Sequence, residues 1–199
     1  MPAWADFLLR FTLFALSHSL LAANRPQEWL RGRLGRLFRC YRLVYNGIAV
    51  VTFLWVMAAW PASPILYRVP GSWGLLCAGG QFITLLLLAR CAGQLGLGTF
   101  LGIDQLRGRE QRPGLVQTGC YCRLRHPQYT LAILFFLLTP VMNARWLVLT
   151  LLSSVYFVYG ALVEERRLLR EFGLHYQEYR NRIPMFLPRR VHLQVPSDR

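Results

Sequence analysis

Two polar motifs contain residue types that can do chemistry, and both stand at the ends of long apolar segments. Arg125-His126-Pro127 opens one apolar segment, and Glu164-Glu165 closes the next one. If both segments cross a membrane and are joined by a short turn, the two motifs return to the same membrane face. A basic, imidazole-bearing cluster then meets two carboxylates beside the lipid, where ionisable groups are costly and usually functional. Such a site suits a charged cofactor from water that meets a lipophilic or volatile substrate.

The elements that must position these motifs are apolar blocks of membrane-spanning length. Of the 199 residues, 54% are hydrophobic, and a helix needs roughly 20 apolar residues to cross a bilayer. Because open backbone groups cannot be satisfied in lipid, these blocks should be helices. The sequence therefore predicts an all-α polytopic membrane protein of about five transmembrane helices, with a C-terminal cytosolic helical segment that completes a cofactor pocket. The expected spans are about 4–22, 42–60, 73–92, 128–143 and 145–163.

The length fits a single membrane domain over residues 1–190. Within it, residues 1–114 supply N-terminal helices, and residues 115–190 supply a cofactor-binding hairpin with the segment that follows. Residues 191–199 are expected to form a flexible tail. Gly93-x-x-Gly96-x-Gly98 is interpreted as close helix packing or a bend at the membrane edge, because a dinucleotide fingerprint needs a preceding strand that the sequence does not show.

The positive charge of the chain follows its expected topology. All 23 basic residues are arginines, and the net charge is +14. All but Arg10, Arg68 and Arg145 fall between spans one and two, between spans three and four, or after span five. The positive-inside rule then places the N-terminus outside and the C-terminus in the cytoplasm. This distribution favours contact with anionic lipid headgroups over binding of nucleic acid, and the predicted location is a bacterial inner membrane.

The five cysteines do not predict a disulfide framework. Four lie at or near the expected cytoplasmic side, where thiols stay reduced. Cys120-x-Cys122 with His126 raises the possibility of a metal site, but a closed zinc site needs four ligands and no fourth ligand is evident, so we expect no bound metal. His18, flanked by Ser17 and Ser19, is interpreted as a hydrogen-bonded packing residue, with a role on the substrate side as the alternative.

Each central motif also has a purely structural interpretation. Proline is favoured in the first turn of a helix, and Arg125 can extend its charge to the membrane interface. Glu164-Glu165 could be a solvated helix face paired to nearby arginines. These two interpretations together leave the pair of carboxylates unexplained. Adjacent carboxylates at the membrane boundary repel each other unless a cation or hydrogen-bond donors satisfy them.

The ordered C-terminal motifs resemble a known superfamily. They are Gly119-x-Tyr121-x-x-x-Arg125-His126-Pro127-x-Tyr129, Glu164-Glu165-x-x-Leu168, Phe172-Gly173-x-x-Tyr176-x-x-Tyr179 and Ile183-Pro184-x-x-x-Pro188. This set, over roughly residues 115–190, is similar to the signature of integral-membrane methyltransferases, which include isoprenylcysteine carboxyl methyltransferases and phospholipid N-methyltransferases. His18-Ser19, Tyr41-Arg42 through Asn46, and Thr99-Phe100 resemble bacterial NnrU-type proteins and methanethiol S-methyltransferases.

The resemblance implies S-adenosylmethionine as the methyl donor and a small or lipophilic acceptor, with a thiol or carboxylate favoured. The cofactor-binding residues that it implies are Tyr121, Arg125, His126, Pro127, Tyr129, Glu164, Glu165, Tyr176 and Tyr179. Carboxylates can attract the sulfonium and ammonium groups, and tyrosines can wall the adenine. Arg180 and Arg182 could orient an anionic acceptor, and Glu164 could take up a proton.

Two departures from the family pattern and two other functions remain open. Cys120 stands where proline is common. Leu131 stands where glycine often occurs, and a glycine there would let the backbone or the cofactor approach closely, so Leu131 bears on the shape of the pocket. A membrane reductase of the sterol-reductase type, which uses NADPH, shares a related pattern, but this chain is short for that class. The chain could also be a non-catalytic NnrU-like accessory protein.

Overall fold

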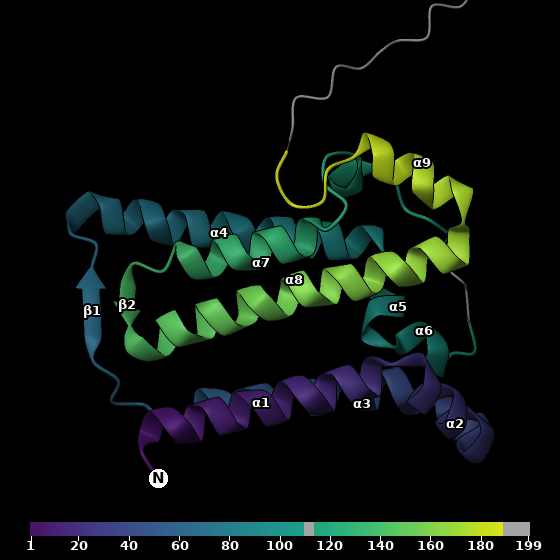
Figure 1. Ribbon diagram of the computed structural model, residues 1–199, viewed down its shortest axis with the longest axis horizontal. Coiled ribbons are helices and arrows are strands. Elements are labelled where there is room, and N and C mark those ends of the chain that lie inside the picture. The colour runs from purple at the N-terminus through teal and green to yellow at the C-terminus, as the bar shows by residue number, and fades with distance from the viewer. Residues whose placement is uncertain (110–113, 189–199) are drawn as a thin grey trace, which may run out of the picture.

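A computed structural model describes residues 1–109 and 114–188, and it shows long helices that lie side by side (Figure 1). The elements, in chain order, are α1 (Ala3–Ala22), α2 (Asn24–Leu34), the 3-10 helix η1 (Gly35–Cys40), α3 (Tyr41–Met57), β1 (Ile65–Arg68), α4 (Gly71–Gln94), α5 (Leu97–Leu101), α6 (Ile103–Leu106), the 3-10 helix η2 (Gly119–Cys122), α7 (Pro127–Leu137), β2 (Val141–Asn143), α8 (Ala144–Phe172) and α9 (Leu174–Arg182). The predicted all-α, polytopic fold is confirmed. The tail at 191–199 lies outside the described residues, and the division at residue 114 stays a prediction.

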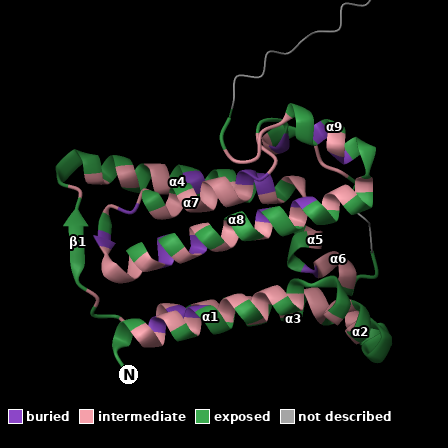
Figure 2. Ribbon diagram, in the orientation of Figure 1, coloured by how far each residue is buried: buried purple, intermediate pink, exposed green. Residues whose placement is uncertain are grey.

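Apolar surface covers the outside of the long helices. Four stretches are long and apolar enough to cross a membrane: Ala3–Ala22, Asn24–Met57, Gly71–Gln94 and Ala144–Phe172. Large side chains such as Leu75, Leu86 and Val155 are more than half exposed on them, and buried residues are sparse along these helices (Figure 2). Because water would not tolerate so much contiguous apolar surface, the chain is an integral membrane protein whose helices face lipid.

The fourth predicted span, 128–143, is shorter in the structure. α7 ends at Leu137, and its 11 residues would extend only about 16 Å, compared with a bilayer core of about 30 Å. Pro140 explains the early end, because proline lacks an N–H and disfavours helical geometry in the residue before it. α7 therefore packs against α4 and α8 as a shorter apolar helix.

The two connections expected outside the membrane pair with each other as an antiparallel ribbon. β1 lies beside β2, with Ile65 opposite Asn143 and Arg68 opposite Val141. The strands were not predicted, because the prolines of the first connection indicated turns and the second connection was interpreted as a tight hairpin. The pairing holds the α3–α4 and α7–α8 connections at one end of the bundle (Figure 1). The polar ends of α7 and α8 consequently lie together at the opposite end.

The buried core joins α1, α3 and α8. One buried cluster contains Phe7, Phe11, Val56 and Leu149. In addition, Arg145 Nη1 donates a hydrogen bond to the carbonyl oxygen of Met57, the last residue of α3, at 2.9 Å. The N-terminal helices are thereby fixed against α8, the helix that carries the acidic motif.

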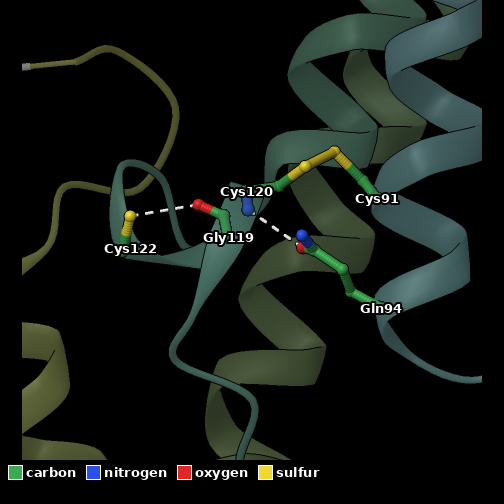
Figure 3. The surroundings of a disulfide bond; sticks show 5 residues. All are labelled: Cys91, Gln94, Gly119, Cys120 and Cys122. Carbon is green, nitrogen blue, oxygen red and sulfur yellow. Dashed lines mark hydrogen bonds between the residues drawn. A yellow bond between two sulfur atoms is a disulfide. The ribbon is translucent and has the colours of Figure 1, made fainter.

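The interpretation of all five cysteines as unpaired is wrong for two of them. Cys91, near the end of α4, forms a disulfide with Cys120 in η2, with a Cα–Cα distance of 5.7 Å (Figure 3). Gln94 reinforces this junction, because its Oε1 accepts a hydrogen bond from the Cys120 backbone N–H at 2.9 Å. The two cysteines are 29 residues apart in sequence, so their proximity depends on the fold. Cys40, Cys77 and Cys122 are free thiols.

Candidate active site

The imidazole motif is held where α7 begins. His126 is the N-cap of α7, and Pro127 is its first residue, where the missing N–H costs nothing. The chain after α9 returns to this corner: the backbone N–H of Arg125 donates to Pro184 O at 2.9 Å, and that of His126 donates to Met185 O at 3.2 Å. The C-terminal segment is therefore part of the site.

Glu165 is the centre of a buried polar network. Its carboxylate lies 2.7 Å from Arg125 Nε and 3.1 Å from His126 Nε2, and it accepts a hydrogen bond from Tyr176 Oη at 2.9 Å. Arg180 approaches the second oxygen at 3.5 Å. With only 8% of its side chain exposed, Glu165 joins α7, α8 and α9 and has little capacity left for a ligand.

Glu164 lies differently although it is the adjacent residue. Its side chain is 36% exposed, and His126 Nδ1 is 3.8 Å away. Tyr129 Oη donates a hydrogen bond to Glu164 Oε2 at 3.2 Å. Since a carboxylate can accept several hydrogen bonds, Glu164 retains the capacity to contact a cationic ligand. The two adjacent carboxylates thus differ in their surroundings: Glu165 is surrounded by its network of contacts, and Glu164 is partly exposed.

Tyrosines complete the wall beside these carboxylates. Tyr179 Oη donates to the Tyr121 carbonyl oxygen at 2.6 Å, and Tyr129 stacks between His126 and Phe157 at centroid distances of 5.6 and 5.5 Å. Burial raises the pKa of Tyr179 to about 12. Burial, and then the hydrogen bond to Glu165, raises the pKa of Tyr176. Both hydroxyls therefore remain neutral donors at physiological pH.

A cavity of about 950 Å³ opens beside this wall. Its size is at the upper end of small-molecule sites. Eight of the predicted site residues line it: Tyr121, Arg125, His126, Pro127, Tyr129, Glu164, Tyr176 and Tyr179. Glu165 and Arg180 lie behind the lining, and Arg182 donates to the carbonyl oxygen of Glu178 within α9, so the structure does not bring Arg182 to the cavity.

The opposite wall comes from the N-terminal half and was missed as a site. Asn24, Gln27, Tyr41 and Arg42 line it together with Tyr45. Arg167 and Arg170 of α8 add cationic groups to the lining. The similarity of the Tyr41–Asn46 stretch to NnrU-type proteins was the signal that could have indicated this wall.

Local contacts bear on three other sequence interpretations. Gly96, with φ of +84°, starts α5 after α4 ends, so the glycine motif forms a bend. Among residues 1–109 and 114–188, no group of three or more His, Cys, Asp or Glu is placed to hold a metal ion, and Cys120 is occupied by its disulfide. Leu131 is not among the described residues that line the cavity.

Comparison with curated proteins gives relatives that match most of this chain. Methanethiol S-methyltransferase 2 of Bradyrhizobium diazoefficiens is 29% identical over 198 residues, which cover 96% of this chain and 76% of the relative. Methanethiol S-methyltransferase of Pseudomonas deceptionensis is 28% identical over 194 residues, or 91% of this chain and 71% of the relative. The enzyme of that name from Mycobacterium tuberculosis is 26% identical over 191 residues, or 91% of this chain and 76% of the relative. No solved structure matches the chain significantly.

The family comparison covers the elements that carry both polar motifs. The profile of the phospholipid methyltransferase family matches residues 72–175, just over half of the chain. The matched range runs from α4 through both polar motifs to the start of α9. It therefore contains the disulfide junction, the His126 corner and both carboxylates. On this match, and in agreement with the resemblance of its motifs, the chain belongs to the phospholipid methyltransferase family.

Proposed function

We propose that this membrane protein transfers a methyl group from S-adenosylmethionine to a small thiol at one face of the bilayer. The observation that carries the proposal is the position of Glu164, a partly exposed carboxylate on a tyrosine-lined cavity. The methanethiol S-methyltransferases to which the chain is similar support a thiol as the acceptor. A thiol is also compatible with the apolar approach that a lipid-facing bundle offers.

The residues on the cavity wall fit the charges of the methyl donor. When bound, S-adenosylmethionine supplies an electrophilic methyl group on a sulfonium. Glu164 can attract the sulfonium or the ammonium of the ligand, and Arg167 and Arg170 can attract its carboxylate. Tyr121 and Tyr41, which line the cavity, can supply aromatic surface to the adenine. These side chains act by holding the donor in line with the acceptor and by excluding water.

Glu165 supports this function indirectly. Its contacts with Arg125, His126 and Tyr176 fix the ends of three elements that carry cavity residues. Catalytic arrangements require such fixed supporting contacts, because small displacements of a bound reactant cost large factors in rate. We propose Glu164 as a ligand of the donor and Glu165 as the residue that positions the cavity wall.

Calorimetric titration of the detergent-solubilised protein tests the donor site. We expect Glu164→Gln to weaken S-adenosylmethionine binding by about tenfold, or about 1.4 kcal/mol. Binding of S-adenosylhomocysteine, whose sulfur is neutral, should fall less if Glu164 faces the sulfonium. Glu178→Gln on exposed α9 surface is the matched control and should bind both ligands normally. Unchanged affinity in Glu164→Gln, or tight binding of NADPH instead, would contradict the proposal.

A further inference from the structure

A second polar cluster lies between α1, α3 and α8, outside the corner built around Glu165. Tyr45 Oη is 2.8 Å from His18 Nε2, and Ser19 Oγ is 2.9 Å from Tyr156 Oη. The His18 ring lies 5.1 Å from the Tyr45 ring and 6.3 Å from the Tyr156 ring, measured between centroids. Polar groups within apolar helices are expensive and usually functional, and the donor site leaves this cluster unexplained.

Tyr45 connects the cluster to the cavity. It lines the same space as Tyr129 and Glu164, while His18 lies behind it on α1. Tyr156 is joined to the donor wall through ring contacts with Phe157, at 6.5 Å, and from Phe157 to Tyr129, at 5.5 Å. An acceptor on the Tyr45 side would therefore share the cavity with a donor held at Glu164.

The charge around Tyr45 is positive. The Arg42 guanidinium lies 5.6 Å from the centre of the Tyr45 ring, and Arg42 also lines the cavity. Positive charge at this distance favours an acceptor that becomes anionic. It disfavours an amine acceptor, which is cationic at neutral pH.

We infer that the His18–Tyr45 pair is the acceptor subsite and deprotonates an alkyl thiol, an assignment that rests on the proposed function. Alkyl thiols are largely protonated at neutral pH, whereas the thiolate is the nucleophile. The thiol proton passes to Tyr45 Oη while the Tyr45 proton passes to His18 Nε2. The sulfur electron pair forms the bond to the methyl carbon. The bond between that carbon and the sulfonium breaks, and its electrons remain on the departing neutral thioether.

The position of the pair also allows the proton to leave. His18 lies in the last turns of α1 and Tyr45 in the first turns of α3, at the end of the bundle where α2 begins (Figure 1). The imidazolium is therefore close to the polar edge, where water can take up its proton. A carboxylate acceptor, already ionised, would gain nothing from this pair, so the geometry points to a protonated thiol.

Two thiols of different acidity test the inference. An alkyl thiol needs the proton transfer through Tyr45 to His18, which we call the relay. An aromatic thiol is largely ionised at neutral pH and does not need it. We expect Tyr45→Phe to lower kcat/KM for the alkyl thiol by about 100-fold, a usual magnitude for general-base catalysis, and to lower that for the aromatic thiol by less than about tenfold. Higher pH should partly restore alkyl-thiol turnover by Tyr45→Phe.

Two further variants separate proton transfer from packing. His18→Gln retains a hydrogen-bond acceptor for Tyr45 but cannot take up a proton, so it should behave like Tyr45→Phe. Tyr159→Phe, on an exposed part of α8, is the matched control. The affinity for S-adenosylmethionine should be unchanged in Tyr45→Phe, His18→Gln and Tyr159→Phe. Equal losses on both thiols, or wild-type rates in His18→Gln, would overturn the relay. Failure of the wild-type protein to methylate either thiol would instead overturn the proposed function, and the relay with it.

Discussion

His126 Nε2 lies 3.1 Å from Glu165 Oε1 although the two residues are 39 positions apart in the chain. One begins α7 and the other lies near the end of α8, so the contact closes the hairpin at its polar end. The β1–β2 ribbon closes the opposite end. Together these contacts place a cavity with carboxylate and tyrosine walls at one end of a lipid-facing bundle.

Glu165→Ala should destabilise the protein more than any change at Glu164. The substitution leaves Arg125 buried without its carboxylate, and breaking a buried ion pair on one side costs about 3 kcal/mol or more. The apparent Tm in detergent reports the loss. Glu164→Ala should shift the Tm little while it weakens donor binding. Equal Tm shifts in the two variants would contradict the separate roles of the two acids.

Stability should fall at alkaline pH through the buried tyrosines. Burial raises the pKa of Tyr121 and Tyr176, and raises that of Tyr179 to about 12. Because tyrosines in the unfolded chain ionise near pH 10, this stabilisation is present below about pH 10 and is lost as the pH rises toward 12. The chain has no lysine to titrate in the same window. The Tm of Tyr179→Phe should decline less steeply over this range, whereas Tyr67→Phe, on exposed β1, should follow the wild type.

The Cys91–Cys120 bond should stabilise the junction between α4 and η2. Closing a loop across 29 positions is expected to contribute about 3 to 4 kcal/mol. Reductant should lower the Tm of the wild type and leave the Cys91→Ser/Cys120→Ser double variant unchanged. Cys122→Ser, which removes a free thiol, should respond like the wild type. Mass spectrometry after thiol alkylation would contradict the bond if it found five reactive cysteines.

Gly119→Ala should disturb the loop that leads to His126. Gly119 has φ of +62°, and a Cβ there would collide with the side-chain amide of Gln94. That amide accepts the hydrogen bond from the Cys120 N–H, so both the strain and the lost contact are expected to act on η2. We predict weaker donor binding and a lower Tm. Gly79→Ala, where no atom lies within 4 Å of the new Cβ, should show neither effect.

The C-terminal half of the site could be predicted from sequence because its residues stand at the ends of apolar segments. His126-Pro127 marks the start of a helix, and Glu164-Glu165 follows an uninterrupted apolar run. The N-terminal wall could not be predicted in this way, since Tyr45 and Arg42 reach the cavity through the tertiary packing of α3, which contacts α1 and α5. The difference between Glu164 and Glu165 likewise depends on how α8 faces α9, which adjacent positions in sequence do not reveal.

Two fold features were hidden for related reasons. Pro140 ends α7 early, although hydropathy alone continues across it. The pairing of Cys91 with Cys120 depends on the return of the chain after α6 to the end of α4. An apolar pattern encodes neither feature: the first is a local effect of proline, and the second is a tertiary contact.

Cysteine accessibility with ligand protection tests the shared cavity most directly. Gln128 in α7 and Leu168 in α8 both line it, and each can be replaced by cysteine after Cys40, Cys77 and Cys122 are changed to serine. In oriented membrane vesicles, an impermeant maleimide should label both positions from the same side, and S-adenosylmethionine should protect both. Labelling from opposite sides, or at equal rates with and without S-adenosylmethionine, would contradict a common donor cavity.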